Sequence, residues 1–405
     1  MKSYVFDPDD ARSLILERCR CPDTEVLSLE KTSGRVLAAD IKARYDVPLF
    51  DKSPLDGYAF HASDTRSVSG QKPVRLAVAE EIPAGAFSHK TLRTGYAVKI
   101  LTGAPVPEGA DAIVKYEDTI AADGYVTIFQ TFRAGDNIIF KGEDVRYGEV
   151  IAAKGTVIDE AVHGMIASQG ITAVEVYCVP LIGIISQGNE LLDPGETLQS
   201  GKIYNSNRYM LQSALAREGL PSMYLGIVPD QMEQISELLE KAVSMFEAVI
   251  MTGGVSVGTY DYTKDALERA GADILVDKIR MKPGSSCCLA TLKGVPVFGL
   301  SGNPSAAMTT FHLIAVPALR RISGRSDCSL QKIRVCLAET FKKKSPVLRV
   351  LKGRLSLEDG KALFHLNQHQ ENGSVSAMRD VEIFAVIPGG SGTVKAGTML
   401  DAYII

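Results

Sequence analysis

The stretch AVIMTGGVSVGTYDYTKD, residues 248–265, has the pattern of a buried strand followed by a glycine-rich loop and a helix. Residues 248–252 form a short apolar run, which indicates a buried strand. Asp261 lies at the expected N-cap of a helix that ends near Gly271. Three glycines leave the loop between them free of Cβ atoms: Gly253, Gly254 and Gly258.

A loop of this kind presents backbone N–H groups and the positive end of a helix dipole to an anion. It lacks the Lys-Ser/Thr pair of a P-loop and the G-x-G-x-x-G spacing of a dinucleotide-binding turn. The stretch therefore favours a phosphate-binding loop, and the alternative is a tight strand–helix turn that holds no ligand.

The composition is that of a globular protein of several domains. The chain has 405 residues, of which 45% are hydrophobic and 23% charged. A net charge of −4 gives no reason to expect a nucleic-acid partner. No apolar run is long enough to span a membrane, and the N-terminus MKSYVFDPDDARS lacks the apolar segment of a secretory signal. We therefore expect a cytoplasmic protein.

The cysteines and histidines indicate neither a metal centre nor a covalent nucleophile. The close pairs Cys19/Cys21 and Cys287/Cys288 lack C-x-x-C spacing, and the six histidines form no H-E-x-x-H motif. We expect free thiols, with Cys287 and Cys288 in a buried strand. No Ser-His-Asp or Cys-His set can be assembled, and His312 is expected to be structural.

Three segments differ in their hydrophobic pattern. Residues 58–150 contain short strands between Gly, Pro and Asp turns, and residues 177–326 alternate strands and helices, which predicts a parallel α/β layer. Residues 327–405 return to short strands and are expected to form a small β domain. Asp7 is expected to cap the first helix, and Asp230 with Glu233 has the pattern of a capping box.

Polar residues follow the predicted strands of the α/β layer. Because ligands of an open α/β sheet bind beyond the carboxyl ends of its strands, we expect these residues to form one site. They are Ser186, Gly188, Asn189, Glu190, Asp230, the loop 253–261, Ser301, Gly302, Asn303 and Ser305.

The predicted strand after residue 273 adds positive charge. With alternation along a strand, Lys278, Arg280 and Lys282 share one face, while Ile279 and Met281 share the other. Carboxylates and cations around a glycine loop are the groups that Mg²⁺-assisted chemistry on a phosphorylated ligand needs. The alternative is a solvated strand face. A second polar loop, DVPLFDKSPLDG at 46–57, is either a functional loop or an interdomain linker.

Seven motifs in order resemble the molybdopterin molybdenumtransferase family of bacterial molybdenum-cofactor synthesis, which is also similar to the C-terminal domain of gephyrin. They are PLDGYAF at 54–60, LTGAPVPEGADAIVKYED at 101–118, SQGNELLDPGE at 186–196, GKIYNSN at 201–207, TGGVSVGTYDYTK at 252–264, KPG at 282–284 and SGNPSAA at 301–307.

The resemblance implies an enzyme that combines molybdate with adenylylated molybdopterin, requires Mg²⁺, and releases AMP. It implies a homodimer whose active sites are shared between subunits, with the molybdopterin adenylyltransferase and apo-molybdoenzymes as transient partners. It also implies four domains. They are an α/β molybdopterin-binding domain (1–26 and 177–326), an elongated linking domain (27–45 and 147–176), a β domain (46–146) and a C-terminal β barrel (327–405).

Site residues carry over from the matching motifs as expectations. Asp261 and Glu190 would bind the metal, and Lys278 and Lys282 would hold molybdate or phosphate oxygens. Further polar catalytic positions are Asp56, Thr102, Glu190 and Asp230. Cofactor-binding positions are Gly253, Gly254, Ser256, Gly258, Asn303, Ser305, Ser374 and Ser376.

The chain departs from the family pattern at several positions. Gln187 stands where threonine is usual, Ser301 where proline is usual and Leu55 where methionine is commonest. SSCC at 285–288 replaces a stretch that usually contains lysine, and Lys352 stands near an expected arginine. Two alternative functions are a molybdopterin adenylyltransferase or related nucleotide-processing enzyme, and a non-enzymatic scaffold by analogy with gephyrin.

Overall fold

The computed structural model describes residues 5–255 and 262–405. The chain divides into two compact units, each discontinuous in sequence. The first comprises Met1–Ala39, Lys154–Asp159 and Ala173–Ile405, and the second comprises Asp40–Ala153 and Glu160–Thr172. The finer division into four domains stays a prediction.

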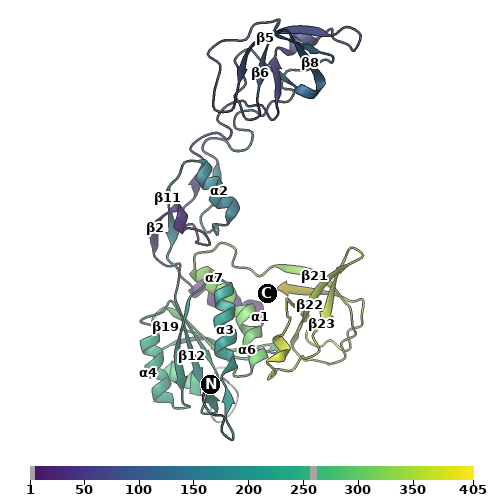
Figure 1. Ribbon diagram of the computed structural model, residues 1–405. Helices are drawn as coiled ribbons and strands as arrows, with labels where there is room; N and C mark the ends of the chain where they lie inside the picture. Colours follow the sequence, from purple (N-terminus) through teal and green to yellow (C-terminus); the bar gives the residue numbers. More distant parts are fainter. Residues whose placement is uncertain (1–4, 256–261) are drawn as a thin grey trace. The chain divides into compact units, whose positions relative to one another are not determined.

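The first unit is built on a seven-stranded sheet of order β1-β17-β19-β20-β16-β12-β15 (Figure 1). Its strands are β1 (Val5–Phe6), β12 (Ile182–Gln187), β15 (Ser222–Val228), β16 (Ala248–Thr252), β17 (Asp273–Ile279), β19 (Ser286–Leu292) and β20 (Val295–Leu300). The prediction of a parallel layer is wrong for β19, which runs antiparallel to both neighbours. Lys293 and Gly294, both with positive φ, form the two-residue hairpin turn that reverses the chain into β20.

Helices cover both faces of this sheet. One face packs against α1 (Pro8–Arg18), α3 (Ser206–Arg217), α6 (Pro304–Thr310) and α7 (Val316–Ile322), and the other against α4 (Met232–Ala242) and α5 (Tyr262–Arg269). Side chains of β16 alternate between the two cores, with Ile250 in the first and Val249 and Met251 in the second. Burial on both faces explains why this strand is uniformly apolar.

The helical segment 304–322 contains a π turn, η4 (Phe311–Ala315), between α6 and α7. Pro317 has no N–H and cannot donate to the carbonyl of Leu313, four residues earlier. The guanidinium of Arg12 in α1 donates to that carbonyl instead, at 3.4 Å. A proline in this position accounts for the local widening of the helix.

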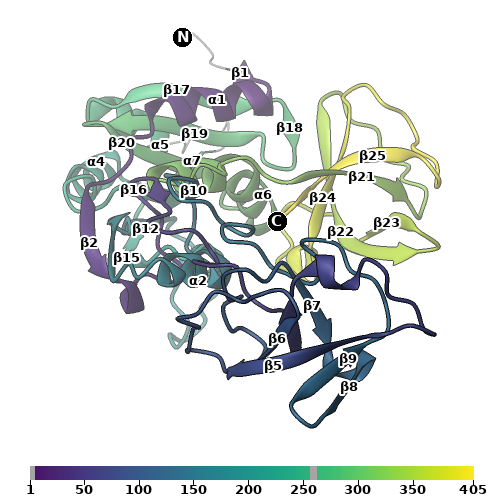
Figure 2. The ribbon, with the colours of Figure 1, turned by 90° about the horizontal axis from the view of Figure 1, so that it is seen from above.

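The predicted C-terminal β barrel is confirmed (Figure 2). The sheet has the order β18-β22-β23-β21-β25-β24, and the additional pairing of β22 with β24 closes it. Val350 and Phe384 of the barrel belong to the same buried core as α1, α3 and α6. The strands are β18 (Met281–Lys282), β21 (Lys332–Leu337), β22 (Leu348–Glu358), β23 (Lys361–Leu366), β24 (Ile383–Ile387) and β25 (Met399–Ile404).

Short paired strands complete the first unit. Two lie next to the α/β sheet in sequence, β13 (Leu191–Leu192) and β14 (Ile203–Tyr204), and pair in parallel. β2 (Thr24–Ser28) pairs antiparallel with β11 (Ala173–Tyr177). Single 3₁₀ turns, η1 (Leu29–Lys31) and η5 (Ser376–Met378), lie in the same unit.

The second unit contains a six-stranded sheet of order β7-β4-β6-β5-β9-β8, as the short-strand pattern predicted. Its strands are β4 (Gly57–Phe60), β5 (Val74–Ile82), β6 (Tyr96–Ile100), β7 (Ala112–Lys115), β8 (Thr119–Ala122) and β9 (Tyr125–Ile128). The unit also contains the pair β3 (Ile41–Lys42) and β10 (Val150–Ala152), helix α2 (Glu160–Ser168), and the turns η2 (Ala62–Thr65) and η3 (Tyr116–Asp118).

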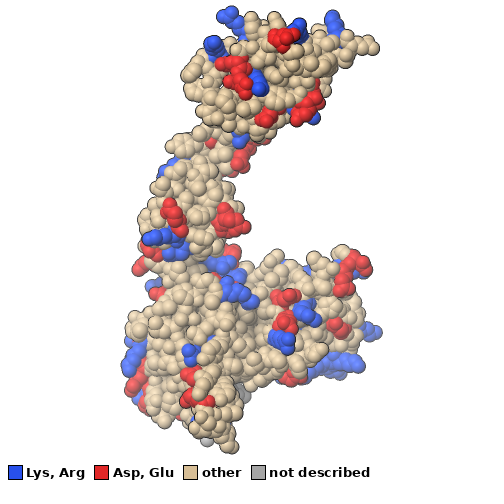
Figure 3. Space-filling view, in the orientation of Figure 1, with Lys and Arg blue, Asp and Glu red and all other residues tan. Residues whose placement is uncertain are grey.

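On the face that Figure 3 shows, Lys and Arg side chains are interspersed with Asp and Glu in each unit. Across residues 5–255 and 262–405, no helix combines the length and apolar character needed to cross a membrane.

Gly253→Ala should destabilise the first unit more than a matched glycine substitution does. Gly253 has a φ of 99°, and an added Cβ would lie 2.1 Å from the carbonyl oxygen of Gln187. Gly219, the control, has a φ of 75° and no atom within 4 Å of the added Cβ. We expect Gly219→Ala to lower the free energy of unfolding by about 1 to 2 kcal/mol through backbone strain alone. For Gly253→Ala we expect about 3 to 5 kcal/mol. Urea unfolding monitored by circular dichroism measures both values, and equal losses would contradict the close packing of Gln187.

Candidate active site

Four parallel strands end together at one edge of the α/β sheet. Ser186 of β12 pairs in register with Thr252 of β16, which pairs with Leu300 of β20. On the other side of β12, Gln187 pairs with Val228 of β15. The segments that follow these strands therefore start at the same edge of the sheet.

The glycine loop begins against β12 and β20. The N–H of Gly253 donates to the carbonyl of Leu300 at 3.0 Å, so this donor is taken and does not face a phosphate. The absence of a side chain at Gly253 instead allows close packing on Gln187. The Cα of Gly253 lies 3.6 Å from where a Cβ of Gly302 would be, so the loop after β20 lies beside it. Ser256, Gly258 and Asp261 fall outside the described residues.

Asp230 follows β15 and accepts two hydrogen bonds from neutral donors. Its Oδ1 accepts from Nε2 of Gln187 at 3.0 Å, and its Oδ2 accepts from the backbone N–H of Asn189 at 3.2 Å. The predicted capping box is wrong, because Gln231 is the N-cap of α4 and makes no side-chain cap bond. Within the part of the chain that the structure describes, Asp230 has no ion-pair partner. Its carboxylate is held in place and remains half exposed.

Glu190 lies over the turn that follows β12. Gly188 has a φ of 150°, and a Cβ there would lie 2.4 Å from Oε2 of Glu190. The ammonium of Lys202 donates to the carbonyl of Asn189 at 2.5 Å. Sequence reasoning did not single out Lys202, although it belongs to the quoted motif GKIYNSN. Carboxylate oxygens of this kind are ligands that Mg²⁺ accepts.

The start of α6 contacts a buried lysine of the barrel. Nζ of Lys352, on β22, lies 2.5 Å from Oγ of Ser305, and both residues are fully buried. The backbone N–H of Ser305 donates to the carbonyl of Asn372 at 3.1 Å. Burial lowers the pKa of Lys352 to about 8, against the opposing attraction of Glu371. The closest partners of this ammonium are a hydroxyl and a backbone carbonyl, and neither neutralises its charge.

The predicted serines lie in the loop beside this contact. A Cβ at Gly373 would be 3.3 Å from Oδ1 of Asn303, so this loop passes next to the start of α6. The hydroxyls of Ser374 and Ser376 are 2.8 Å apart and hydrogen bond to each other. The fold therefore brings Asn303, Ser305 and the serine loop together, although about 70 residues of chain separate them.

The predicted row of three cations is only partly correct. Ile279 and Met281 are buried, Lys278 is half buried, and Lys282 is exposed, as the alternation predicts. However, β17 ends at Ile279, and Lys282 belongs to β18 of the barrel sheet. The turn after Lys282 packs on α6, where Oγ1 of Thr310 donates to the carbonyl of Gly284 at 3.2 Å.

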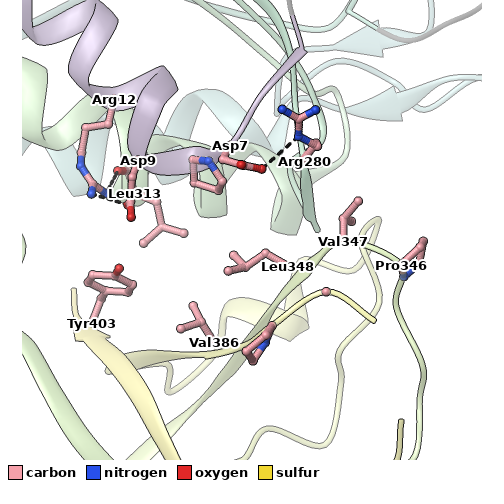
Figure 4. A pocket seen from close by; sticks show the side chains of 13 residues that line it. Asp7, Asp9, Arg12, Arg280, Leu313, Pro346, Val347, Leu348, Val386 and Tyr403 are labelled. Atoms are coloured by element: carbon pink, nitrogen blue, oxygen red, sulfur yellow. Dashed lines mark hydrogen bonds and ion pairs between the residues drawn. The ribbon is translucent and has the colours of Figure 1, made fainter. Parts of the chain in front are cut away.

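Arg280 instead lies at the margin of a cavity of about 380 Å³ between α1 and the barrel, beside Asp7 (Figure 4). Its Nε lies 3.0 Å from Oδ1 of Asp7, so this cation is paired. Asp7 is the N-cap of α1 by position, but its side chain makes no cap bond and contacts Arg280 instead. Arg12 pairs with Asp9 at 2.6 Å in the same cavity. Arg280 therefore does not complete a phosphate site with Lys278 and Lys282.

Asp56 and Thr102 form a hydrogen-bonded pair in the second unit. Oδ1 of Asp56 accepts from the backbone N–H of Thr102 at 2.7 Å and from its hydroxyl at 2.8 Å. These two bonds hold the pKa of Asp56 below its usual value. The pair is exposed to solvent and keeps a carboxylate available for a ligand.

Three other residues have the structural roles that the sequence predicted. His312 is buried between Phe311 and Phe384, and burial lowers its pKa to about 3, which keeps the ring neutral. Cys287 and Cys288 lie buried on β19 as reduced cysteines. In residues 5–255 and 262–405, no group of three or more His, Cys, Asp or Glu side chains is arranged to hold a metal ion.

Comparisons with known proteins cover almost the whole chain. Residues 6–170 match the MoeA N-terminal region (domains I and II), 183–321 a probable molybdopterin binding domain, and 334–405 the MoeA C-terminal region (domain IV). A molybdopterin molybdenumtransferase of Staphylococcus epidermidis is 35% identical over 93% of this chain and 90% of its own length. The chain belongs to the molybdopterin molybdenumtransferase family.

Other members of the molybdopterin molybdenumtransferase family agree with this assignment. The Staphylococcus aureus protein of that name is 36% identical over 93% of this chain and 90% of its own length. The crystal structure of a molybdopterin biosynthesis MoeA protein from Pyrococcus horikoshii OT3 has a TM-score of 0.84 at 29% identity. It covers 99% of this chain and 100% of its own. Members of the family are enzymes, which argues against a purely structural scaffold.

Lys352→Met should remove a pH dependence of stability. Below about pH 8 the folded wild type holds a buried ammonium, so the variant should be more stable than the wild type by up to about 3 kcal/mol. Between about pH 8 and 10.5 the unfolded wild type binds a proton that the folded protein lacks. Raising the pH through this window therefore stabilises the wild type and reduces the difference in free energy of unfolding between the variant and the wild type.

Urea unfolding at a series of pH values from 7 to 10.5 measures this gap. The exposed Lys344→Met variant is the control, because its ammonium is solvated in both states. A gap between wild type and Lys352→Met that is constant across the series would contradict the burial of the charge.

Proposed function

We propose that this protein inserts molybdenum into molybdopterin, in a Mg²⁺-dependent reaction of adenylylated molybdopterin with molybdate that gives molybdenum cofactor and AMP. The observation that carries the proposal is the edge at which β12, β15, β16 and β20 end. There the glycine loop and the carboxylates of Glu190 and Asp230 follow strand ends, and the start of α6, which follows β20, contacts a buried lysine of the barrel. Membership of the molybdopterin molybdenumtransferase family supports the same reaction.

The pyrophosphate of the substrate would bind at the glycine loop. The N–H of Gly253 is taken by Leu300, so the phosphate donors are the N–H groups from Gly254 onward, together with Ser256 and Gly258. Each oxygen of Asp230 accepts one hydrogen bond and retains a lone pair for an N–H or O–H group of the substrate.

The molybdate oxyanion would bind between the barrel and α6. Lys352 and Ser305 supply an ammonium and a hydroxyl that are already desolvated, so an anion there interacts with them more strongly than it would in water. Lys278 and Lys282, which make no ion pair within residues 5–255 and 262–405, would add charge for molybdate or phosphate oxygens. Asn303, Ser374 and Ser376 would complete the polar wall. Lys352 thus takes the role of the arginine expected near this position.

Glu190 and Asp261 would hold Mg²⁺. When bound by these carboxylates, Mg²⁺ would supply Lewis acidity and positive charge next to the phosphates of the substrate. Glu190 makes no ion pair among the described residues, which fits a carboxylate reserved for a cation.

The proposed active protein is a cytoplasmic homodimer. Asp56 and Thr102 lie in a unit separate from the glycine loop, and we propose that they complete the active site of the partner subunit. The substrate would come from a molybdopterin adenylyltransferase and the product would pass to apo-molybdoenzymes, as transient partners. The alternative reading, an adenylyltransferase or related nucleotide enzyme, is disfavoured by the matches to the MoeA N-terminal and C-terminal regions.

Purified protein mixed with adenylylated molybdopterin, molybdate and Mg²⁺ should release AMP and produce cofactor that activates an apo-molybdoenzyme. Omitting molybdate, or chelating Mg²⁺ with EDTA, should abolish the formation of active cofactor. AMP is measured by chromatography and the cofactor by reconstitution. Absence of AMP, or AMP without active cofactor, would overturn the proposed function.

Two inactive variants should complement each other if the active site is shared. Asp56→Asn and Asp230→Asn remove carboxylates from the two units. After random reassociation of equal amounts, about half of the dimers are mixed, and each has one intact site, so about one quarter of the wild-type activity should return. The readout is AMP release by the mixture compared with each variant alone. A mixture that stays as inactive as its components would exclude a shared site.

A further inference from the structure

Gln187 connects the two sides of the strand-end edge through a buried amide. It is the last residue of β12, and its side chain is 1% exposed. Its Oε1 accepts a hydrogen bond from the hydroxyl of Thr263 at 2.7 Å, and its Nε2 donates to Oδ1 of Asp230 at 3.0 Å. One side chain thus joins the first turn of α5 to the residue that follows β15.

The chemistry of the partners determines the orientation of this amide. Asp230 as a carboxylate can only accept, so it must face the NH₂ group of Gln187. The hydroxyl of Thr263 then donates to the amide oxygen. Both polar groups of the buried side chain are satisfied in this orientation, and the reverse orientation would oppose oxygen to oxygen at Asp230.

The start of the glycine loop packs so closely on Gln187 that Gly253 and Gly254 have no room for a side chain. A Cβ at Gly254 would lie 2.2 Å from Nε2 of Gln187, and one at Gly253 would lie 2.1 Å from its carbonyl oxygen. Thr263 also closes the loop, because its N–H donates to the carbonyl of Gly254 at 3.3 Å. Gly253 and Gly254 therefore pack directly on Gln187, and the position of the Asp230 carboxylate depends on the Gln187 amide.

We propose that Gln187 is a positioning residue that holds the ionised carboxylate of Asp230 toward the substrate. The proposal rests on the proposed function, because the amide matters for activity only if the reaction uses the carboxylate of Asp230.

Four variants distinguish the effect of the Gln187–Asp230 hydrogen bond on stability from its effect on activity. Gln187→Glu keeps the acceptor for Thr263 but places a second carboxylate against Asp230. Thr263→Val removes the bond on the other side of the amide, together with the contact of the same hydroxyl with the carbonyl of Gly253 at 3.2 Å. Asp230→Asn removes the charge. The double variant Gln187→Glu/Asp230→Asn restores a hydrogen bond with its direction reversed, because the new NH₂ group donates to the new carboxylate.

The melting temperature and kcat/KM for adenylylated molybdopterin are measured for each variant. Gln187→Glu should lower kcat/KM by about 10- to 100-fold and lower the melting temperature. The double variant should regain the wild-type melting temperature, yet its kcat/KM should stay at the level of Asp230→Asn. Thr32→Val, which removes a buried hydroxyl that donates to Leu29, is the control for loss of stability alone and should keep the wild-type kcat/KM.

The outcomes distinguish a role of Gln187 in positioning Asp230 from a role in stability alone. Wild-type kcat/KM in Gln187→Glu, or recovery of kcat/KM together with the melting temperature in the double variant, would overturn the positioning role. Failure of the wild type to release AMP would instead overturn the proposed function. In that case the melting temperatures still test whether Gln187 and Asp230 interact. Additive effects of Gln187→Glu and Asp230→Asn on the melting temperature would show that the two side chains are not coupled.

Discussion

The parallel register of β12, β15, β16 and β20 is the constraint on which the candidate site depends. Parallel strands that start on the same side of a sheet must end on the same side, so four separate loops emerge at one edge. The hydrophobic cores on both faces hold this register, because a slip of one residue would exchange the faces of every side chain. The position of the loops is thus fixed by the apolar residues of the strands.

The charged groups of the candidate site are held mainly by hydrogen bonds to neutral groups. Asp230 is held by an amide and a backbone N–H, and Lys352 is held by a hydroxyl and a carbonyl. Neutral partners fix the position of a charged group without neutralising it. This arrangement leaves the carboxylate of Asp230 and the ammonium of Lys352 without a direct charged partner among the described residues.

Local patterns failed where a distant side chain competed for the same group. Asp7 and Asp230 both stand next to helix starts, and sequence alone favours capping for both. In the folded chain, Asp7 pairs with Arg280, and Asp230 accepts from Gln187 and Asn189. These partners lie far away in sequence, so no local rule can identify them. The same reason accounts for Arg280, which pairs with Asp7 and leaves the predicted row of cations.

The sequence by itself determined the α/β layer, the β segments, the ordered family motifs and most residues of the strand-end edge, because these depend on periodicity and on short-range spacing. Only the tertiary structure decided that β19 is antiparallel, that Gln187 reaches both Thr263 and Asp230, and that Lys352 contacts Ser305. Each of these features joins segments distant in sequence, and its free energy comes from burial that exists only after the sheet and barrel have packed.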